Sequence, residues 1–95
     1  MNKIKEISYV LAATDDKELI EGFLKSILTR NEIDEISSRW ELVKQLHDGI
    51  SQRKIAERFG LSLCKITRGS RELKKNPSSF RIMIEKFKES GRGTE

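Results

Sequence analysis

The segment between Ser51 and Lys75 is unusually rich in lysine and arginine. This segment contains 8 Lys or Arg residues and 2 Asp or Glu residues. Such a local excess of positive charge is typical of a surface that binds a polyanion, with nucleic acid as the first candidate. The alternative is a basic helix face that contacts only solvent. The net charge of the 95 residues is +4, with 7 basic and 10 acidic residues in positions 1–50 and 12 basic and 5 acidic residues in positions 51–95.

The stretch Gln52–Arg71 has the residue pattern of a helix-turn-helix, in which two short helices pack at a steep angle. Ala56 is small enough for close contact between the helices, and Gly60 tolerates the positive φ angle that the turn requires. Ile66 is placed to point from the second helix back to the first. The flanking positions are also apolar: Ile55, Phe59 and Leu61. Gly69 departs from the pattern, because many such motifs have an apolar residue there.

The second helix of a helix-turn-helix places its N-terminal residues in the major groove of DNA. We expect four side chains near its start to face base edges: Leu63, Cys64, Lys65 and Thr67. The apolar side chains suit a thymine methyl group, and Lys65 suits a guanine edge or a phosphate. Residues at the start of the first helix and the end of the second are expected to bind phosphates: Gln52, Arg53, Lys54, Lys74 and Lys75.

Other kinds of chemistry are not indicated. The sequence has no paired-carboxylate motif, no Ser/His/Asp or Cys/His set and no glycine loop suited to phosphate, so an enzyme is not expected. His47 has no cysteine or carboxylate at metal-ligand spacing, and Cys64 is the single cysteine, so we expect no disulfide, no metal and no cofactor. The longest apolar run, residues 9–13, is too short for a membrane span, and no signal peptide is visible, which predicts a cytoplasmic protein.

The secondary structure around the basic segment, and in the rest of the chain, is predicted to be helical. The chain has one proline and no segment with strand alternation, which indicates an all-α fold of six short helices. The first is expected around residues 4–11, and the others begin at predicted caps: Asp15 or Asp16, the capping box of Thr29 and Glu32, Ser51, Ser62, and Asn76 before Pro77. Gly49 and Gly60 are expected to end the third and fourth helices.

Four of these helices have apolar stripes that need a partner surface. The stripe of the first helix is Ile4, Ile7, Val10 and Leu11, and that of the second is Leu19, Ile20, Phe23, Leu24, Ile27 and Leu28. The stripe of the third is Ile33, Ile36, Trp40, Val43 and Leu46, and that of the sixth is Phe80, Met83, Ile84 and Phe87. A chain of this size buries only about two-thirds of its unfolded surface, so we expect a homodimer, with a marginal monomer as the alternative. Each subunit is expected to be one domain over residues 1–95 with a polar tail at 90–95.

Several motifs resemble the bacterial tryptophan repressor family. They are Leu28-Thr29 followed by Glu32, Arg39, SQRKIAERFG (Ser51–Gly60), ITRGS (Ile66–Ser70) and Leu73-Lys74. The resemblance covers about Leu19 to Phe87, and ITRGS after a helix-turn-helix is its most specific element. It implies a six-helix subunit of an intertwined homodimer, in which L-tryptophan as corepressor orients the two helix-turn-helix motifs for binding a palindromic operator.

The same resemblance implies a tryptophan site. Arg39 and Arg68 would flank the indole, and Arg68 would pair with the carboxylate. Main-chain carbonyls, expected from the other subunit, would bind the amino group: Ser26, Leu28 and Thr29. Gly69 would leave room for the ring. Glu72 stands where the family has a serine that helps to hold the amine, so its carboxylate either pairs with the ammonium group or forms a surface ion pair with Arg68.

These features predict a tryptophan-dependent transcriptional repressor that binds double-stranded operator DNA. Two alternatives remain open: a ligand-independent helix-turn-helix module of transposase or initiator type, and a helical protein–protein module that binds an acidic partner. The connection at residues 48–51 is one residue shorter than in the family. Cys64 and Lys65 replace smaller residues of the DNA-facing surface, so the operator need not match that of any relative.

Overall fold

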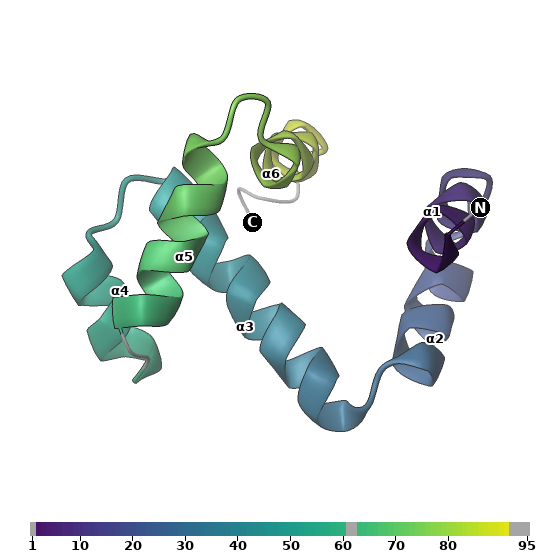
Figure 1. The fold of residues 1–95 in the computed structure, drawn as a ribbon, viewed down its shortest axis with the longest axis horizontal. Coiled ribbons are helices and arrows are strands. Elements are labelled where there is room, and N and C mark those ends of the chain that lie inside the picture. The colour runs from purple at the N-terminus through teal and green to yellow at the C-terminus, as the bar shows by residue number, and fades with distance from the viewer. Residues whose placement is uncertain (1, 61–62, 92–95) are drawn as a thin grey trace. The chain divides into compact units, whose positions relative to one another are not determined.

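The computed structural model describes residues 2–60 and 63–91, which form six α-helices and no strand (Figure 1). The helices are α1 (Lys3–Ala12), α2 (Lys17–Ile27), α3 (Arg30–His47), α4 (Gln52–Phe59), α5 (Leu63–Lys74) and α6 (Ser79–Glu89). The all-α prediction is confirmed. The chain divides into two compact units, an N-terminal unit (Met1–Ile36) and a C-terminal unit (Ser37–Glu95), and α3 contributes to both. The single domain over residues 1–95 stays a prediction.

Short-range hydrogen bonds begin α2, α3 and α4 at the residues that the sequence predicted. The side chains of Asp16 and Ser51 each accept a hydrogen bond from the backbone N–H three residues later. The capping box of α3 is reciprocal: the Glu32 N–H donates to the Thr29 hydroxyl at 3.1 Å, and the Thr29 N–H donates to the Glu32 carboxylate at 2.8 Å. These bonds satisfy amides that have no partner inside the helix, so neighbouring residues alone determine where each helix starts.

The predicted start of the sixth helix at Asn76 and Pro77 is wrong by two residues. The cap of α6 is Ser78, whose hydroxyl oxygen accepts from the backbone N–H three residues later at 3.1 Å. The same hydroxyl donates to the backbone carbonyl of Glu72 in α5 at 2.8 Å, and Ser78 is buried. Ser78 therefore satisfies polar groups of two helices at once, which Asn76 at an exposed position does not.

The helices of the N-terminal unit contain no buried residue. This holds for all the described residues of α1 and α2. Large apolar side chains are exposed along both helices: Ile4, Tyr9, Val10, Leu19, Leu24 and Ile27. The apolar stripe predicted for α2 therefore has no complete partner surface within this unit.

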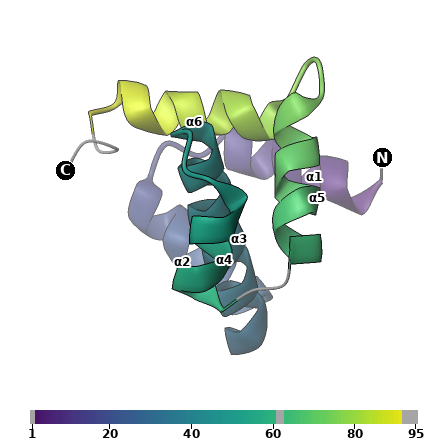
Figure 2. The same ribbon diagram turned by 90° about the vertical axis from the view of Figure 1, so that its left-hand side faces the viewer.

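The hydrophobic core lies in the C-terminal unit, where α4, α5 and α6 pack with the second half of α3 (Figure 2). Its buried residues come from all four helices: Leu42, Val43, Ile55, Ile66, Leu73 and Ile84. Trp40 is partly buried at the edge of this core, where it stacks on Phe80 at 5.9 Å between ring centroids and meets the edge of Phe87 at 6.1 Å. Trp40 thus packs as a core residue, as its place in the stripe predicted.

Two positions predicted for the apolar stripes of α3 and α6 are exposed within one chain. Ile36 is 41% exposed and Met83 is 57% exposed, whereas Leu42, which lies outside the predicted stripe of α3, is 2% exposed. Leu42 is buried on the side from which α5 approaches, since the backbone at Gly69 comes close to Leu42 and Val43 of α3. The buried side of α3 therefore includes a residue next to the predicted stripe.

Candidate functional site

α4 and α5 lie side by side in the C-terminal unit (Figures 1 and 2). Gly60 ends α4 in the left-handed conformation, with φ 62° and ψ 28°, and its N–H donates to the Ala56 carbonyl at 2.9 Å. The conformation predicted for Gly60 is therefore confirmed. Ile55 of α4 and Ile66 of α5 are fully buried and hold the pair to the core. Residues 61–62, which include the predicted cap of α5, lie outside the described residues.

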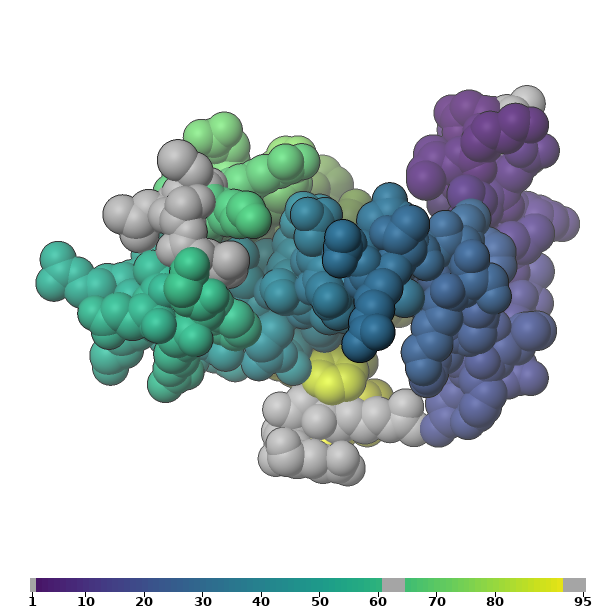
Figure 3. Space-filling view, turned by 90° about the horizontal axis from the view of Figure 1, so that it is seen from below, coloured from purple at the N-terminus to yellow at the C-terminus, as the bar shows by residue number. Residues whose placement is uncertain are grey.

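The side chains predicted to contact DNA are exposed wherever the structure describes them. They are Gln52, Arg53, Lys54, Lys65, Thr67 and Lys74 on α4 and α5, and Lys75 directly after α5. Lys75 forms an ion pair with Glu72, whereas the other six side chains have no hydrogen bond or ion pair within the described part of the chain. Figure 3 shows that α4 forms an outer surface of its unit. The side chains of Leu63 and Cys64, also predicted to face bases, lie outside the described structure.

The positive charge of this surface is poorly neutralised by carboxylates. Neither α4 nor α5 has an acidic residue in its first turn, so no carboxylate of these turns offsets the partial positive charge of the helix N-termini. The two carboxylates on these helices are Glu57 and Glu72, and Glu72 forms an ion pair with Lys75 at 2.9 Å. The arrangement is chemically suited to bind an extended anion.

The residues expected to bind tryptophan are divided between the two units. Arg39 of α3 and Arg68 of α5 belong to the C-terminal unit, and both are exposed with no ion-pair partner among the described residues. The three main-chain positions belong to the N-terminal unit: Ser26, Leu28 and Thr29. Their assignment to the other subunit of a dimer stays a prediction.

Gly69 is buried where α5 packs against α3. A Cβ atom at this position would lie 3.1 Å from Cγ2 of Val43 and 3.4 Å from Cδ1 of Leu46. The glycine therefore has a packing role within the subunit, which the sequence did not indicate. Its predicted role as space for an aromatic ring remains untested.

Glu72 forms an ion pair with Lys75, a partner that neither prediction for Glu72 included. Its carboxylate pairs with the Lys75 ammonium group, and it forms no ion pair with Arg68. The hydrogen bond from Lys75 is the main reason why the pKa of Glu72 is lowered, and the charges of Arg68 and Arg71 lower it further. Glu72 is thus ionised near neutral pH and chemically able to bind a cation.

Three contacts between helices support this surface and were not predicted. The Arg81 guanidinium donates to the Leu73 carbonyl at 2.8 Å and so satisfies the end of α5. The Arg58 guanidinium of α4 donates to the Gln45 side chain of α3 at 3.3 Å. A third contact joins α6 to the end of α3 through Lys88, which forms an ion pair with Asp48 and lies 3.0 Å from Nδ1 of His47. All three join residues distant in sequence, so no local pattern signals them.

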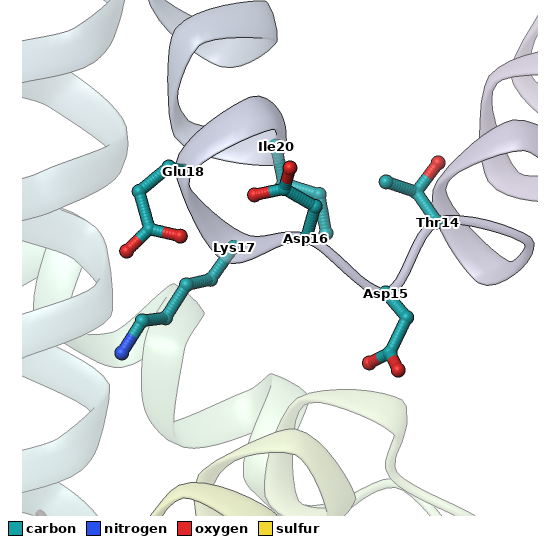
Figure 4. A pocket seen from close by; sticks show the side chains of 6 residues that line it. All are labelled: Thr14, Asp15, Asp16, Lys17, Glu18 and Ile20. Atoms are coloured by element: carbon teal, nitrogen blue, oxygen red, sulfur yellow. The ribbon is translucent and has the colours of Figure 1, made fainter.

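A shallow hollow in the N-terminal unit is a weaker candidate for a site. It surrounds the connection between α1 and α2, and its lining runs from Thr14 to Ile20. The labelled side chains point in different directions and do not converge on one point (Figure 4). One of its carboxylates, Asp16, already caps α2. Among the described residues, no cluster of three His, Cys, Asp or Glu side chains is arranged to hold a metal, and no helix is long and apolar enough to cross a membrane.

Comparison with known proteins gives consistent similarities. A family model described as Trp repressor protein matches residues 2–88. A Trp operon repressor homolog of Xylella fastidiosa is 40% identical over 65 residues, which is 67% of this chain and 67% of that protein. A Trp operon repressor homolog of Chlamydia trachomatis is 31% identical over 71 residues, or 74% of this chain and 76% of the relative. One from Vibrio campbellii is 27% identical over 88 residues, with 92% and 88% covered. No solved structure gives a significant match.

Proposed function

The chain belongs to the Trp repressor family, and from this premise we propose that it represses transcription by binding operator DNA in response to L-tryptophan. The resemblance inferred from the ITRGS segment is thereby confirmed. The family consists of transcriptional regulators, so a repressor-type role follows and an enzymatic one does not. Binding of a palindromic operator, dependence on tryptophan, the homodimer and a cytoplasmic location are parts of the proposal.

The observation that best supports DNA binding is the surface of α4 and α5. Six exposed polar or basic side chains there have no partner within the described part of the chain, and Gly60 ends α4 in the left-handed conformation that the turn of a helix-turn-helix requires. We propose that the two helices form a helix-turn-helix. In that arrangement Lys65 and Thr67 face base edges, and Arg53 with Lys54 binds phosphates.

The proposed tryptophan response rests on Arg39 and Arg68. Both guanidinium groups are exposed and unpaired in the described structure, so neither needs to break an intramolecular bond to bind a ligand. L-tryptophan can increase DNA affinity only if it binds more tightly to the DNA-competent arrangement than to the others. A homodimer would place the carbonyls of Ser26, Leu28 and Thr29 beside the arginines of the other subunit.

A mobility-shift titration on palindromic operator candidates, with and without L-tryptophan, tests this proposal. We expect L-tryptophan to raise the affinity for one palindrome at least fivefold, since coupling energies of about 1–3 kcal/mol correspond to roughly 5- to 150-fold. A salt series at fixed tryptophan gives a slope of about −0.9 per phosphate contact. Absence of any DNA binding would instead favour the protein–protein module.

A ligand-independent DNA-binding module is the second candidate, because one observation favours it. The close approach of α5 to Val43 is a sufficient reason for a glycine at position 69, so no aromatic ligand is needed to explain it. Isothermal titration calorimetry with L-tryptophan separates the two candidates. Heat of binding with saturation at one tryptophan per chain supports the corepressor mechanism, and no heat together with unchanged operator affinity supports the ligand-independent module.

A further inference from the structure

α5 presents a basic face that includes an arginine to which no role has been assigned. Residues three and four positions apart share one face of a helix. The buried face of α5 consists of Ile66, Gly69 and Leu73. Next to it, at spacings of four and three, lies the exposed series of Thr67, Arg71 and Lys74. Arg71 is therefore flanked along the helix by two residues that the proposed function places at the DNA.

The exposed part of α5 next to Arg71 contains Lys65, Arg68 and the partly exposed Glu72. The charge of Arg71 lowers the pKa of the Glu72 carboxyl, so the two side chains are near each other. The carboxylate nevertheless forms its ion pair with Lys75, at 2.9 Å, and not with Arg71. The exposed Arg71 side chain has no hydrogen bond or ion pair with any residue that the structure describes.

We propose that Arg71 binds a phosphate of the DNA backbone and forms a phosphate-binding pair with Lys74. This inference rests on the proposed function, because it requires α5 to lie at DNA. The guanidinium group suits the task, since its planar set of N–H donors can bind two phosphate oxygens at once. The pair contributes two positive charges.

The position of Arg71 along α5 favours a phosphate over a base. Arg71 lies eight residues after the first residue of α5, or roughly 12 Å along the helix axis at 1.5 Å per residue. Base contacts come from the N-terminal residues of such a helix, and its later residues reach the edge of the groove, where the backbone runs. Arg71 and Lys74 are separated by about 4.5 Å along the helix axis, so both belong to the part of α5 that reaches the edge of the groove.

The test is the salt dependence of DNA binding by Arg71→Ala, measured on the operator and on unrelated duplex DNA with the full-length chain and L-tryptophan present. Loss of one phosphate contact makes the slope of log K against log[salt] less steep by about 0.9. We expect this change, and an equal fold-loss of affinity for both DNAs. Arg71→Lys keeps the charge and is expected to keep the wild-type slope. Arg71 is exposed, so the helical circular dichroism of both variants should match that of the wild type.

Arg58→Ala is the matched control, because Arg58 is an exposed arginine in the last turn of α4 whose guanidinium is bound to Gln45. It removes the same charge and is expected to leave the slope unchanged. The inference is overturned if Arg71→Ala keeps the wild-type slope, if Arg58→Ala lowers the slope equally, or if Arg71→Ala weakens only the operator complex. If the wild type does not prefer the operator, the proposed function fails, and the slopes on unrelated DNA still decide the role of Arg71.

Discussion

At the scale of single residues, Arg68 shows how a charged side chain can be prepared for a ligand. Two charged groups at α5 have a partner within the chain: Glu72 pairs with Lys75, and Arg81 donates to the Leu73 carbonyl. Arg68 is exposed and has no such partner among the described residues. An unpaired guanidinium can form a two-point bond with a carboxylate without first losing another bond.

We predict that Arg68→Ala raises the Kd for L-tryptophan about 10- to 150-fold, because a hydrogen bond to a charged group contributes about 1.5–3 kcal/mol. Isothermal titration calorimetry measures the change, and circular dichroism checks that the helices are retained. Arg58→Ala serves as the control, since its guanidinium is bound to α3, and we expect it to bind L-tryptophan normally. Wild-type affinity in Arg68→Ala would place the carboxylate elsewhere.

At the scale of helices, the contact between α3 and α5 depends on Gly69, which has no side chain. A Cβ at Gly69 would meet Val43, which is fully buried and, as a β-branched residue, has few rotamers into which it can move. Glycine lowers the intrinsic stability of a helix by about 1 kcal/mol relative to alanine. Overpacking a core costs about 1–3 kcal/mol, so the crowding outweighs the gain in helix propensity.

We therefore predict that Gly69→Ala destabilises the protein by about 1 kcal/mol, which lowers Tm by about 4–8 °C for a chain of this size. Gly22→Ala is a matched control within α2, where a Cβ would meet nothing within 4 Å. It is expected to raise the free energy of unfolding by roughly 0.5–1 kcal/mol. Thermal and urea denaturation measure both changes. A rise in stability for Gly69→Ala would show that α5 can move away from α3 at little cost.

At the scale of the whole molecule, the described helices α1 and α2 of the N-terminal unit form no buried hydrophobic core like that of the C-terminal unit. They contain no buried residue among those described, and large apolar side chains are exposed on them: Tyr9 is 69% exposed and Leu19 is 60% exposed. Apolar side chains in such number favour association, because each buried leucine or similar residue contributes about 1.5–3 kcal/mol. A second copy of the chain is the partner that the proposed function requires.

We predict that the chain is a dimer, with a mass by light scattering twice the 11.0 kDa of one chain and a Tm that rises with protein concentration. Leu19→Glu should weaken the dimer, since it puts a charge into the apolar stripe of α2. Lys25→Glu places the same charge on the polar side of that helix and should leave the mass unchanged. A monomeric wild type at micromolar concentration would contradict the prediction.

The number and type of the helices, most of their starts and the family could be predicted from the amino-acid sequence. The caps at Asp16, Thr29 and Ser51 could be predicted because each is a hydrogen bond between residues three positions apart. The left-handed conformation of Gly60 could be predicted because glycine adopts it without steric cost. These hydrogen bonds and this backbone conformation depend on neighbouring residues only, so they do not depend on the tertiary structure.

The burial of each apolar residue, and the pairing of each charged side chain, depend on the tertiary structure. Leu42 is buried, and Ile36 and Met83 are exposed, because the direction of packing between helices selects one side of each apolar stripe. Ser78 replaces Asn76 as a cap because its hydroxyl also reaches α5. The same holds for the candidate site. The types of its residues can be recognised in the sequence, but the exposure of their side chains and the partners they bind depend on contacts between residues far apart in the chain.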